Sequence, residues 1–506
     1  MLDGMRADMI ETSPVWQDLK ANRWAEPYRA LWSVDASNDP FTKTNSAPNH
    51  TLIATGFSAD VHKVTDNKFF GNFDAEAAPV FLQTLHRRLN IPVLYAFSWG
   101  PDKMLIPECP AIVLGADDIR NMERLHAILQ RPDAPEAILV LDDGPDGGGH
   151  HTGFYPYGEE YVTRTEAAMK RLARLLTAIR ERPTFEKEDW LIVICADHGG
   201  LGTGHGMAGG QASTVPLLFC GRHLPAGRIA GRPDNASIAP MVLRHFGLAD
   251  EAAKLPGSCD FAVKEEPPPS PPERGLVYDL AVREKGLVNA AGAGGGINLK
   301  SEVWGAGGFS LRGTMPVGGG AFELSNAGWL LLDALRGRGE EDFSFAIEME
   351  IDPAEIGDEA VPVFGNKRVG EGDEPGFCFF WREKMLRANF GRDPALPADY
   401  LAPKPGRLDL WGFGSVPGKR TLVAASIGRD GLVTLLQKHP DGHTYWFSVK
   451  RAGLRLSSGR DWVLGWDNAE DARGDVVRIR SYSKIYRFRF WDRALTLEEL
   501  RAPEMR

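Results

Sequence analysis

Short continuous apolar runs and longer amphipathic segments alternate along residues 1–262. The apolar runs predict buried strands at residues 91–99, 137–143, 190–196 and 214–221. Amphipathic segments at residues 78–88 and 164–182 predict helices between them. Continuous apolar strands separated by helices are typical of a parallel sheet that is covered on both faces. We therefore predict an α/β domain with a mostly parallel sheet and helices on both faces, whose ligands bind at the carboxyl ends of the strands.

Beyond residue 262 the pattern changes to the alternation of a half-buried strand. A proline run within residues 263–274 predicts a stiff linker. Residues 275–506 are rich in glycine and aromatic residues, and turn signals separate their alternating runs. The clearest of these runs are residues 343–351, 422–427, 432–438 and 486–491. This pattern predicts a second domain that is an all-β antiparallel sandwich.

Composition and charge exclude several classes of protein. The 506 residues are 43% hydrophobic and 25% charged, which is ordinary for a globular chain and excludes disordered and fibrous classes. Apolar runs have strand length, so we predict no transmembrane segment. A formal charge of −10 argues against a role in coating nucleic acid. The five cysteines are scattered and include no CxxC pair, which excludes a disulfide framework and a cysteine-based zinc site.

The beginning of the chain predicts a strand end that turns into a helix at Asp3 and Gly4. No charged and apolar secretory signal precedes this turn in the given sequence. We expect a native start further upstream, where the preceding strand and an export signal would lie. We also expect Asp3 to be weakly anchored as a result.

Four segments of the first domain carry clusters of Asp, His and Ser. These candidate residues are Asp3, Ser46, the pair Asp146 and His150 after the second strand, and the set Asp197, His198 and His205 after the third. Carboxylates and neutral imidazoles gathered in one pocket suit zinc or a similar divalent ion. Glycines at residues 147–149 and 199–206 predict loops that bend and let these short side chains converge. Two ions about 4 Å apart would stabilise both the attacking and the leaving oxygen of a displacement at phosphorus.

Each segment taken alone also has an ordinary structural interpretation. Ser46 before Pro48 suits a helix N-cap, and Asp146 with His150 suits a glycine-rich turn. A carboxylate such as Asp3 near a terminus is usually solvated, and Asn67 alone would be a turn residue. The order of these motifs along the chain, taken together, favours a common site.

The segments resemble the alkaline phosphatase superfamily, and most closely its type I phosphodiesterase/nucleotide pyrophosphatase branch. The motifs in order are Asp3-Gly4, Ser46 to His50 (Ser-Ala-Pro-Asn-His), Thr55-Gly56, Asn67, Pro145-Asp146 with His150, Asp197-His198-Gly199 and Gly204-His205-Gly206. The resemblance spans about residues 1–250. It implies an alkaline phosphatase-like fold and two divalent ions, with zinc as the expected metal.

The resemblance also implies a role for each motif residue. One ion would be held by Asp3, Ser46, Asp197 and His198, and the other by Asp146, His150 and His205. Ser46 would be the catalytic nucleophile, deprotonated by its metal, and would form a phosphoserine intermediate. Asn67 would be catalytic through a hydrogen bond to a nonbridging phosphoryl oxygen.

Two residues depart from the patterns of related enzymes. Ser46 stands where this branch usually has Thr. This difference weakens the assignment of a substrate more than the assignment of a mechanism. His50 stands where sulfatases carry Arg, which argues against a sulfatase. The segment at residues 97–103 does not match the corresponding stretch of nucleotide pyrophosphatases, so nucleotide specificity is not carried over.

The second domain is similar to laminin G-like, concanavalin A-like jelly rolls. The segment YRFRFWDRALTLEEL at residues 486–500 resembles the closing strand and helical turn of that family. Such domains bind sugars or proteins or add structure, and Trp466 and Trp491 are candidates either for stacking on a sugar or for the core. A glycan or surface polymer is therefore an expected partner of this domain.

The sequence thus predicts an exported metal-dependent hydrolase of phosphate esters, with a phosphodiesterase as the first hypothesis. The site motifs offer Asn67 but no evident Arg for the additional charge of a monoester. The alternatives are a phosphomonoesterase that uses the same residues, a sulfatase, and an inactive glycan-binding or protein-binding module.

Overall fold

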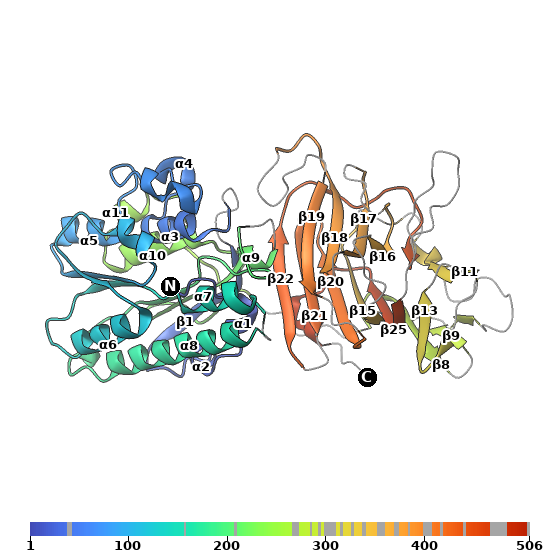
Figure 1. Ribbon diagram of the computed structural model, residues 1–506, viewed down its shortest axis with the longest axis horizontal. Helices are drawn as coiled ribbons and strands as arrows, with labels where there is room; N and C mark the ends of the chain where they lie inside the picture. The colour runs from blue at the N-terminus through green and yellow to red at the C-terminus, as the bar shows by residue number, and fades with distance from the viewer. Residues whose placement is uncertain are drawn as a thin grey trace. The chain divides into compact units, whose positions relative to one another are not determined.

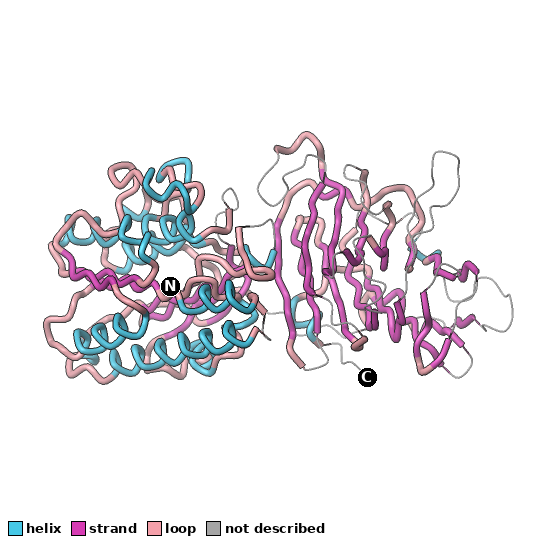
Figure 2. The backbone as a smooth tube through the Cα atoms, in the orientation of Figure 1, coloured by secondary structure: helices cyan, strands magenta, loops and turns pink. Residues whose placement is uncertain are grey.

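The structure is a computed structural model of the chain. It describes residues 1–37, 43–155, 158–206, 210–265, 273–283, 286–291, 295–297, 310–313, 317–324, 328–335, 338, 341–351, 360–368, 374–382, 385–397, 407–414, 418–438, 442–465 and 483–502. Most of the predicted proline linker and Trp466 therefore lie outside the described residues. The chain divides into two compact units, Met1–Glu266 and Pro267–Arg506. Helices are concentrated in the first unit and strands in the second (Figure 2). Among the described helices, none is both long enough and apolar enough to cross a membrane.

The first unit contains α-helices and strands in alternation. Its helices are α1 (Ala7–Ile10), α2 (Pro14–Lys20), α3 (Ser46–Thr55), α4 (Ala59–His62), α5 (Phe81–Leu89), α6 (Asp118–Leu129), α7 (Gly144–Thr152), α8 (Glu159–Arg180), α9 (Gly210–Ser213), α10 (Ile238–His245) and α11 (Ala249–Ala252). Its short 3₁₀ helices are η1 (Asn67–Asn72), η2 (Gly100–Leu105), η3 (Phe185–Lys187) and η4 (Asn235–Ser237). Its strands are β1 (Arg29–Ser37), β2 (Val93–Phe97), β3 (Ala111–Gly115), β4 (Ala137–Leu141), β5 (Ile192–Cys195), β6 (Thr214–Gly221) and β7 (Gly227–Arg228).

These strands form two sheets. The first is parallel, three-stranded and ordered β3-β2-β4, and every residue of β2 is buried, as expected for a central strand covered on both faces. Helices α3, α5 and α10 lie on one side of the strands, and α6 and α8 lie on the other (Figure 1). The α/β class and the helices on both faces are thus as predicted for this unit.

The second sheet of this unit is mixed and has the order β5-β6-β1-β7. Strand β6 runs antiparallel to both β5 and β1, so the prediction that residues 214–221 join a parallel sheet is wrong. The physical reason is that a fully buried strand has the same continuous apolar pattern in either direction: every residue of β6 is buried, so its pattern does not determine its orientation. Strand β1 was not predicted by the sequence pattern.

Residues 1–3 lie between the two sheets and hydrogen-bond to both. The Met1 ammonium donates to the Val140 carbonyl at 2.7 Å, and Asp3 N–H donates to the Asp142 carbonyl at 2.8 Å. On the other side, Leu2 N–H donates to the Cys195 carbonyl at 2.9 Å. Leu2 and Asp142 form a parallel bridge. The first residues therefore link the carboxyl ends of β4 and β5 through backbone hydrogen bonds.

The second unit is an antiparallel β-sandwich. One sheet has the order β10-β9-β8-β25-β15-β20-β21-β22, with β12 and β13 beside it, and the other has the order β11-β14-β24-β16-β17-β18-β19, with β23 beside it. The strands are β8 (Leu276–Arg283), β9 (Gly286–Asn289), β10 (Gly295–Ile297), β11 (Ser310–Gly313), β12 (Val317–Gly318), β13 (Ala321–Leu324), β14 (Gly328–Leu331), β15 (Phe343–Ile351), β16 (Val361–Gly365), β17 (Phe377–Arg382), β18 (Met385–Arg392), β19 (Arg407–Gly414), β20 (Thr421–Ile427), β21 (Leu432–Lys438), β22 (Thr444–Lys450), β23 (Leu454–Arg455), β24 (Val463–Leu464) and β25 (Ser483–Trp491). The short helices η5 (Asp333–Leu335) and α12 (Leu497–Arg501) complete it.

Aromatic side chains from both sheets meet in the core of this sandwich. Phe364 of β16 lies with its ring centroid 5.0 Å from that of Phe345 on β15 and 5.1 Å from that of Phe488 on β25. Edge-to-face contacts of this kind add to the burial of apolar area that holds two sheets together. The strands predicted at residues 343–351, 422–427, 432–438 and 486–491 are all present and antiparallel.

Candidate metal centre

Asp3 is held at the carboxyl end of the sheets by backbone geometry that only glycine accommodates well. Gly4 has φ +68°, and a Cβ on it would lie 2.7 Å from the Cα of Asp146. Its N–H donates to Oδ1 of Asp197 at 3.1 Å. Together with the bonds of residues 1–3 to β4 and β5, this contact fixes Asp3, so the expectation of a weakly anchored Asp3 is wrong.

Ser46 is the first residue of α3, a helix in which all ten residues are buried. Gly56 ends the helix in the left-handed conformation, as expected for a C-cap glycine. The Ser46 hydroxyl lies 3.2 Å from Nε2 of His198. Asn67 begins η1, and its Oδ1 accepts a hydrogen bond from Ala47 N–H at 2.9 Å. This bond fixes the side chain of Asn67 beside the first turn of α3, with its amide nitrogen as the remaining polar group.

Asp146 and His150 lie one turn apart on α7, so both face the same side of that helix. Nε2 of His150 is 3.2 Å from Oδ2 of Asp146. The glycines between them do not form the predicted bent loop, because they belong to the helix. They permit close packing instead: a Cβ on Gly148 would lie 2.8 Å from the carbonyl oxygen of Glu160 on α8, and one on Gly149 would collide with the Phe154 ring.

Asp197, His198 and His205 come from the segment that follows β5. Both Asp197 and His198 are fully buried, and His205 is mostly buried. Nδ1 of His198 donates to the Gly199 carbonyl at 2.8 Å, and Nδ1 of His205 donates to the Thr44 carbonyl at 2.8 Å. The segment therefore contacts the chain just before the Ser46 helix.

Asp3, Asp197 and His198 form one group of potential metal ligands. Nε2 of His198 lies 3.4 Å from Asp3 Oδ1 and 3.1 Å from Asp197 Oδ2. With Ser46 at 3.2 Å from the same nitrogen, the four residues expected to hold the first ion are brought together.

The residues expected to hold the second ion also converge. Nε2 of His150 lies 3.1 Å from Nε2 of His205, and the latter lies 3.7 Å from Asp146 Oδ1. Asp146 and His205 also form a group of potential metal ligands with His198, so His198 lies between the two sets. A further group joins Asp3 and Asp146 with Asp143.

The separations fit the ligands of a tetrahedral ion. Zinc bonds of about 2.0–2.1 Å imply ligand atoms roughly 3.3 Å apart, and most of the separations above are 3.1–3.4 Å. A mixture of imidazole and carboxylate donors is compatible with zinc or a similar divalent ion.

The hydrogen-bonding pattern of the imidazoles supports the same fit. Nδ1 of His150 faces the Thr203 carbonyl at 2.9 Å, and those of His198 and His205 also face carbonyls. A carbonyl only accepts, so each neutral ring is protonated at Nδ1 and has a lone pair on Nε2. These lone pairs point toward one another and toward carboxylates. Among the described residues, neither oxygen of Asp3 accepts a hydrogen bond, nor does Oδ1 of Asp146.

Sequence reasoning missed two residues that contact these ligands. Nε2 of His50 lies 3.1 Å from carboxylate oxygens of both Asp3 and Asp197, and its Nδ1 lies 2.8 Å from Asp102 Oδ1. Both His50 and Asp102 are buried. His50 stands in the Pro-Asn-His motif, which is a signal for it, but nothing in the local sequence around Asp102 indicates its contact.

The carboxylates and imidazoles shift one another's pKa values. Burial, with the charges of Asp197 and Asp146, raises the pKa of Asp3 well above its usual value. Burial alone would lower the pKa of His50, but the charges of Asp102, Asp3 and Asp197 raise it well above the usual value. The hydrogen bond to Asp146 raises the pKa of His150 to about 9. Burial and the neighbouring His198 lower the pKa of His205 to about 4.

Asp143, which belongs to the third group of potential ligands, is also perturbed. Burial and then the nearby Asp146 and Asp118 raise its pKa to about 7. It precedes α7 directly and was not singled out by the sequence.

Comparisons with known proteins identify no family for this chain. No family model matches the chain, and no curated protein matches it. Among solved structures, the chain is similar to the binding domain of botulinum neurotoxin serotype C1 (12% identity, TM-score 0.31, 46% of this chain and 52% of that one). It is also similar to the binding domain of Paraclostridial Mosquitocidal Protein 1 (9% identity, TM-score 0.31, 46% and 52%). The chain covers about half of each of these structures, and the scores are too low to define a fold or a function.

Replacement of Gly4 by alanine tests the geometry that places Asp3. We expect Gly4→Ala to lower the free energy of unfolding by about 2 kcal/mol or more, since it adds a backbone collision to a left-handed conformation. It should also weaken zinc binding, measured by titration. Gly231→Ala is the matched control, because Gly231 has φ +79° and nothing within 4 Å of the added Cβ. Equal losses in the two variants would contradict the proposed constraint at Gly4.

The pKa of His150 predicts how zinc affinity depends on pH. A metal must displace the proton that His150 holds below about pH 9, so affinity should rise by up to about tenfold per pH unit between pH 7 and 9. Calorimetric titration measures both the affinity and the released proton. His150→Ala should weaken binding and flatten this slope. His151→Ala should change neither, because His151 is exposed and pairs with Glu160 at 2.6 Å. A slope that survives His150→Ala would show that another group releases the proton.

Proposed function

We propose that the first unit is a metal-dependent hydrolase of phosphoric esters, a phosphodiesterase by preference, with Ser46 as its nucleophile. The observation that carries the proposal is the position of the Ser46 hydroxyl. It lies at the start of a buried helix and 3.2 Å from His198 Nε2, beside two convergent sets of imidazole and carboxylate donors. Asn45, and not Ser46, is the N-cap residue of α3. A hydroxyl in contact with such donors suits a nucleophile.

Each residue has a role in the proposed reaction. Two bound divalent ions, held by Asp3, Ser46, Asp197 and His198 and by Asp146, His150 and His205, would supply electrostatic stabilisation of the charge on the attacking and leaving oxygens. The Ser46 oxygen loses its proton to solvent and forms a bond to phosphorus, while the bond to the alcohol breaks and the alcohol leaves with a proton from solvent. Water then cleaves the phosphoserine bond and regenerates Ser46.

Asn67 supports the same reaction through its amide. Its Oδ1 already accepts from Ala47 N–H, so the amide nitrogen is the group that would donate to a nonbridging phosphoryl oxygen. His50 is a positioning residue, since it contacts the carboxylates of Asp3 and Asp197 and not the nucleophile.

The charges near the nucleophile favour a diester. A monoester carries an additional negative charge that a cation would have to balance. Lys43, the cation of the nucleophile segment, pairs with Asp66 at 2.6 Å and is thus already engaged with a carboxylate.

The remaining parts of the sequence-based hypothesis stay proposals. They are the alkaline phosphatase-like arrangement of the first unit, the laminin G-like identity of the sandwich, and a glycan or surface polymer as its partner. Trp491, one candidate for stacking on a sugar, is buried, as are Trp381, Trp446 and Trp462. The tryptophans of the sandwich whose burial the structure describes therefore belong to its core.

Hydrolysis of two chromogenic esters tests the function. With zinc added, we expect faster hydrolysis of bis-p-nitrophenyl phosphate than of p-nitrophenyl phosphate. Ser46→Ala should lower the diester rate by roughly 10³-fold or more while leaving zinc content near its original level, because it removes the attacking oxygen. Ser46→Thr keeps a hydroxyl and should retain part of the activity.

Ser13→Ala is a control, since Ser13 is a buried serine on the N-terminal side of α2. Faster hydrolysis of the monoester than of the diester would be compatible with the same site but would exclude a phosphodiesterase. Unchanged activity in Ser46→Ala would exclude the proposed nucleophile, and absence of both activity and bound zinc would exclude the hydrolase.

A further inference from the structure

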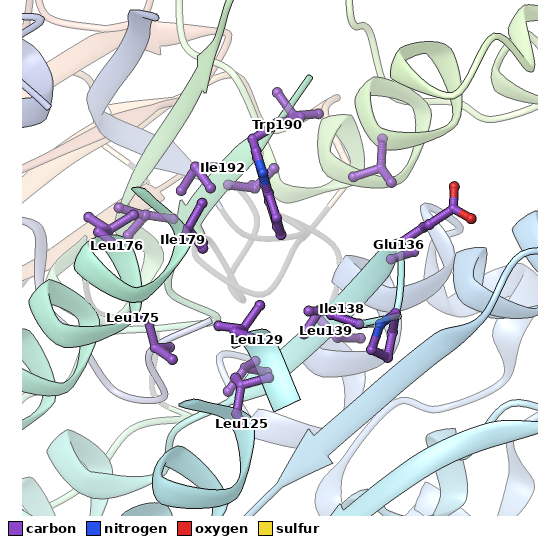
Figure 3. A pocket seen from close by; sticks show the side chains of 18 of the residues that line it. Leu125, Leu129, Glu136, Ile138, Leu139, Leu175, Leu176, Ile179, Trp190 and Ile192 are labelled. Atoms are coloured by element: carbon purple, nitrogen blue, oxygen red, sulfur yellow. The ribbon is translucent and has the colours of Figure 1, made fainter. Parts of the chain in front are cut away.

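The two edges of the three-stranded sheet in the first unit have different surroundings. At one edge, β4 borders an apolar cavity of about 690 Å³, toward which Leu129, Ile138, Leu176 and Ile192 point (Figure 3). At the other edge, β3 pairs only with β2 among the described strands. The β3 edge therefore presents backbone N–H and C=O groups with which a further strand could pair.

Exposed apolar side chains gather around the β3 edge. Among the described residues, every large hydrophobic side chain that is exposed lies within residues 89–119, and the exposed fractions are 36–62%. We call these residues the edge surface: Leu89, Met104, Ile106, Ile112, Val113 and Ile119. Exposed apolar residues are normally scattered singly over a globular protein, so this concentration is typical of an interaction site.

The edge surface lies on both faces of β3. Ala111 packs against the apolar core to which α5 contributes, so Val113, two residues further on, faces the same layer of helices. Ile112 faces the opposite layer. Glu108 N–H donates to Oε1 of Gln83 on α5 at 3.0 Å, so the segment that leads into β3 runs along α5. Apolar groups therefore flank the outer backbone edge of β3 on both sides.

Strand β3 lacks the features with which edge strands usually prevent pairing. Its five residues, Ala111–Gly115, include no charged residue and no proline. Its pairing with β2 continues through all five residues without a bulge. Natural edge strands are commonly protected by lysine, proline or a bulge. A regular and apolar edge therefore favours another strand as its partner.

The charges at the two ends of β3 favour a second copy of this chain as that partner. Before the strand, the exposed side chains of Arg87 and Glu108 lie 3.9 Å apart. After the strand, those of Asp117 and Arg120 lie 3.3 Å apart. Each end thus has one guanidinium and one carboxylate. In an antiparallel pair of two copies, the beginning of one strand lies beside the end of the other, so opposite charges from the two copies meet at both ends.

We propose that β3 is a dimerisation edge, which pairs antiparallel with β3 of a second copy around a two-fold axis at Val113. Val113 is the central residue of the strand, so this register alone pairs all five residues of both copies. The two parallel sheets become one continuous sheet, and the edge surfaces cover each other. One short strand with flanking side chains forms an interface at the small end of the known range, so we expect a dissociation constant on the order of 10 μM.

Sedimentation equilibrium of the full chain, from about 1 to about 100 μM, measures the association. We expect the mass to rise from that of a 55.5 kDa monomer toward twice this value. Val113→Lys should weaken association by about tenfold or more, because it places like charges opposite each other at the axis. Ile119→Lys should also weaken it, and this change at the exposed beginning of α6 leaves the sheet intact. Thr163→Lys is the matched control, since it adds the same charge at an exposed position of α8 and should have no effect.

A charge exchange tests both the identity of the partner and the register. Glu108→Arg should weaken the dimer, because it brings a second guanidinium close to Arg120 of the other copy. Glu108→Arg combined with Arg120→Glu should restore association. Amide hydrogen exchange in β3 should slow with rising protein concentration in the original chain, but not in Val113→Lys.

Four results would overturn the proposal. They are a chain that stays monomeric over the whole concentration range, equal association of Val113→Lys and Thr163→Lys, a dimer in which the β3 amides gain no protection, and a double charge exchange that fails to restore association. The third result would place the dimer interface elsewhere, and the fourth would exclude the antiparallel register. None of these measurements depends on hydrolytic activity or on bound metal.

Discussion

The concentration of negative charge at the carboxyl ends of β4 and β5 is the constraint on which the first unit depends. Asp3, Asp146 and Asp197 are all buried, and their oxygens lie within a few ångströms of shared imidazole nitrogens. Buried carboxylates are tolerated only when cations or hydrogen bonds compensate them. His50 contacts two of them, and the hydrogen bond to Asp146 raises the pKa of His150 to about 9, so the proton that His150 holds below this pH compensates the third. Divalent cations would satisfy both kinds of donor at once.

The same constraint links the site to the sheets. Asp3 is a candidate metal ligand, and the backbone of residues 1–3 hydrogen-bonds to the carboxyl ends of β4 and β5. The position of Asp3 is therefore set by both strands.

Much of the architecture could be predicted from hydrophobic periodicity and motif order. Apolar runs located β2, β4, β5 and β6, and alternation located the main strands of the sandwich, because burial on one or two faces leaves a strong local pattern. The direction of β6 could not be predicted in this way, since a buried strand has the same pattern whether it is parallel or antiparallel. The glycines of α7 were assigned to a loop because propensity disfavours them in helices, whereas close packing against α8 requires them. The candidate residues Asp3, Ser46 and His205 were singled out by residue type at the ends of strands and by the order of the motifs, but the contact of Asp102 with His50 depends on tertiary structure alone.

Anomalous X-ray scattering at the zinc edge, from crystals grown with zinc, would locate the proposed metal ions. Two peaks about 4 Å apart are predicted, one beside Asp3, Asp197 and His198 and the other beside Asp146, His150 and His205. Absence of both peaks from this cluster, with the side chains in place and zinc in the crystallisation solution, would contradict the proposed two-metal hydrolase.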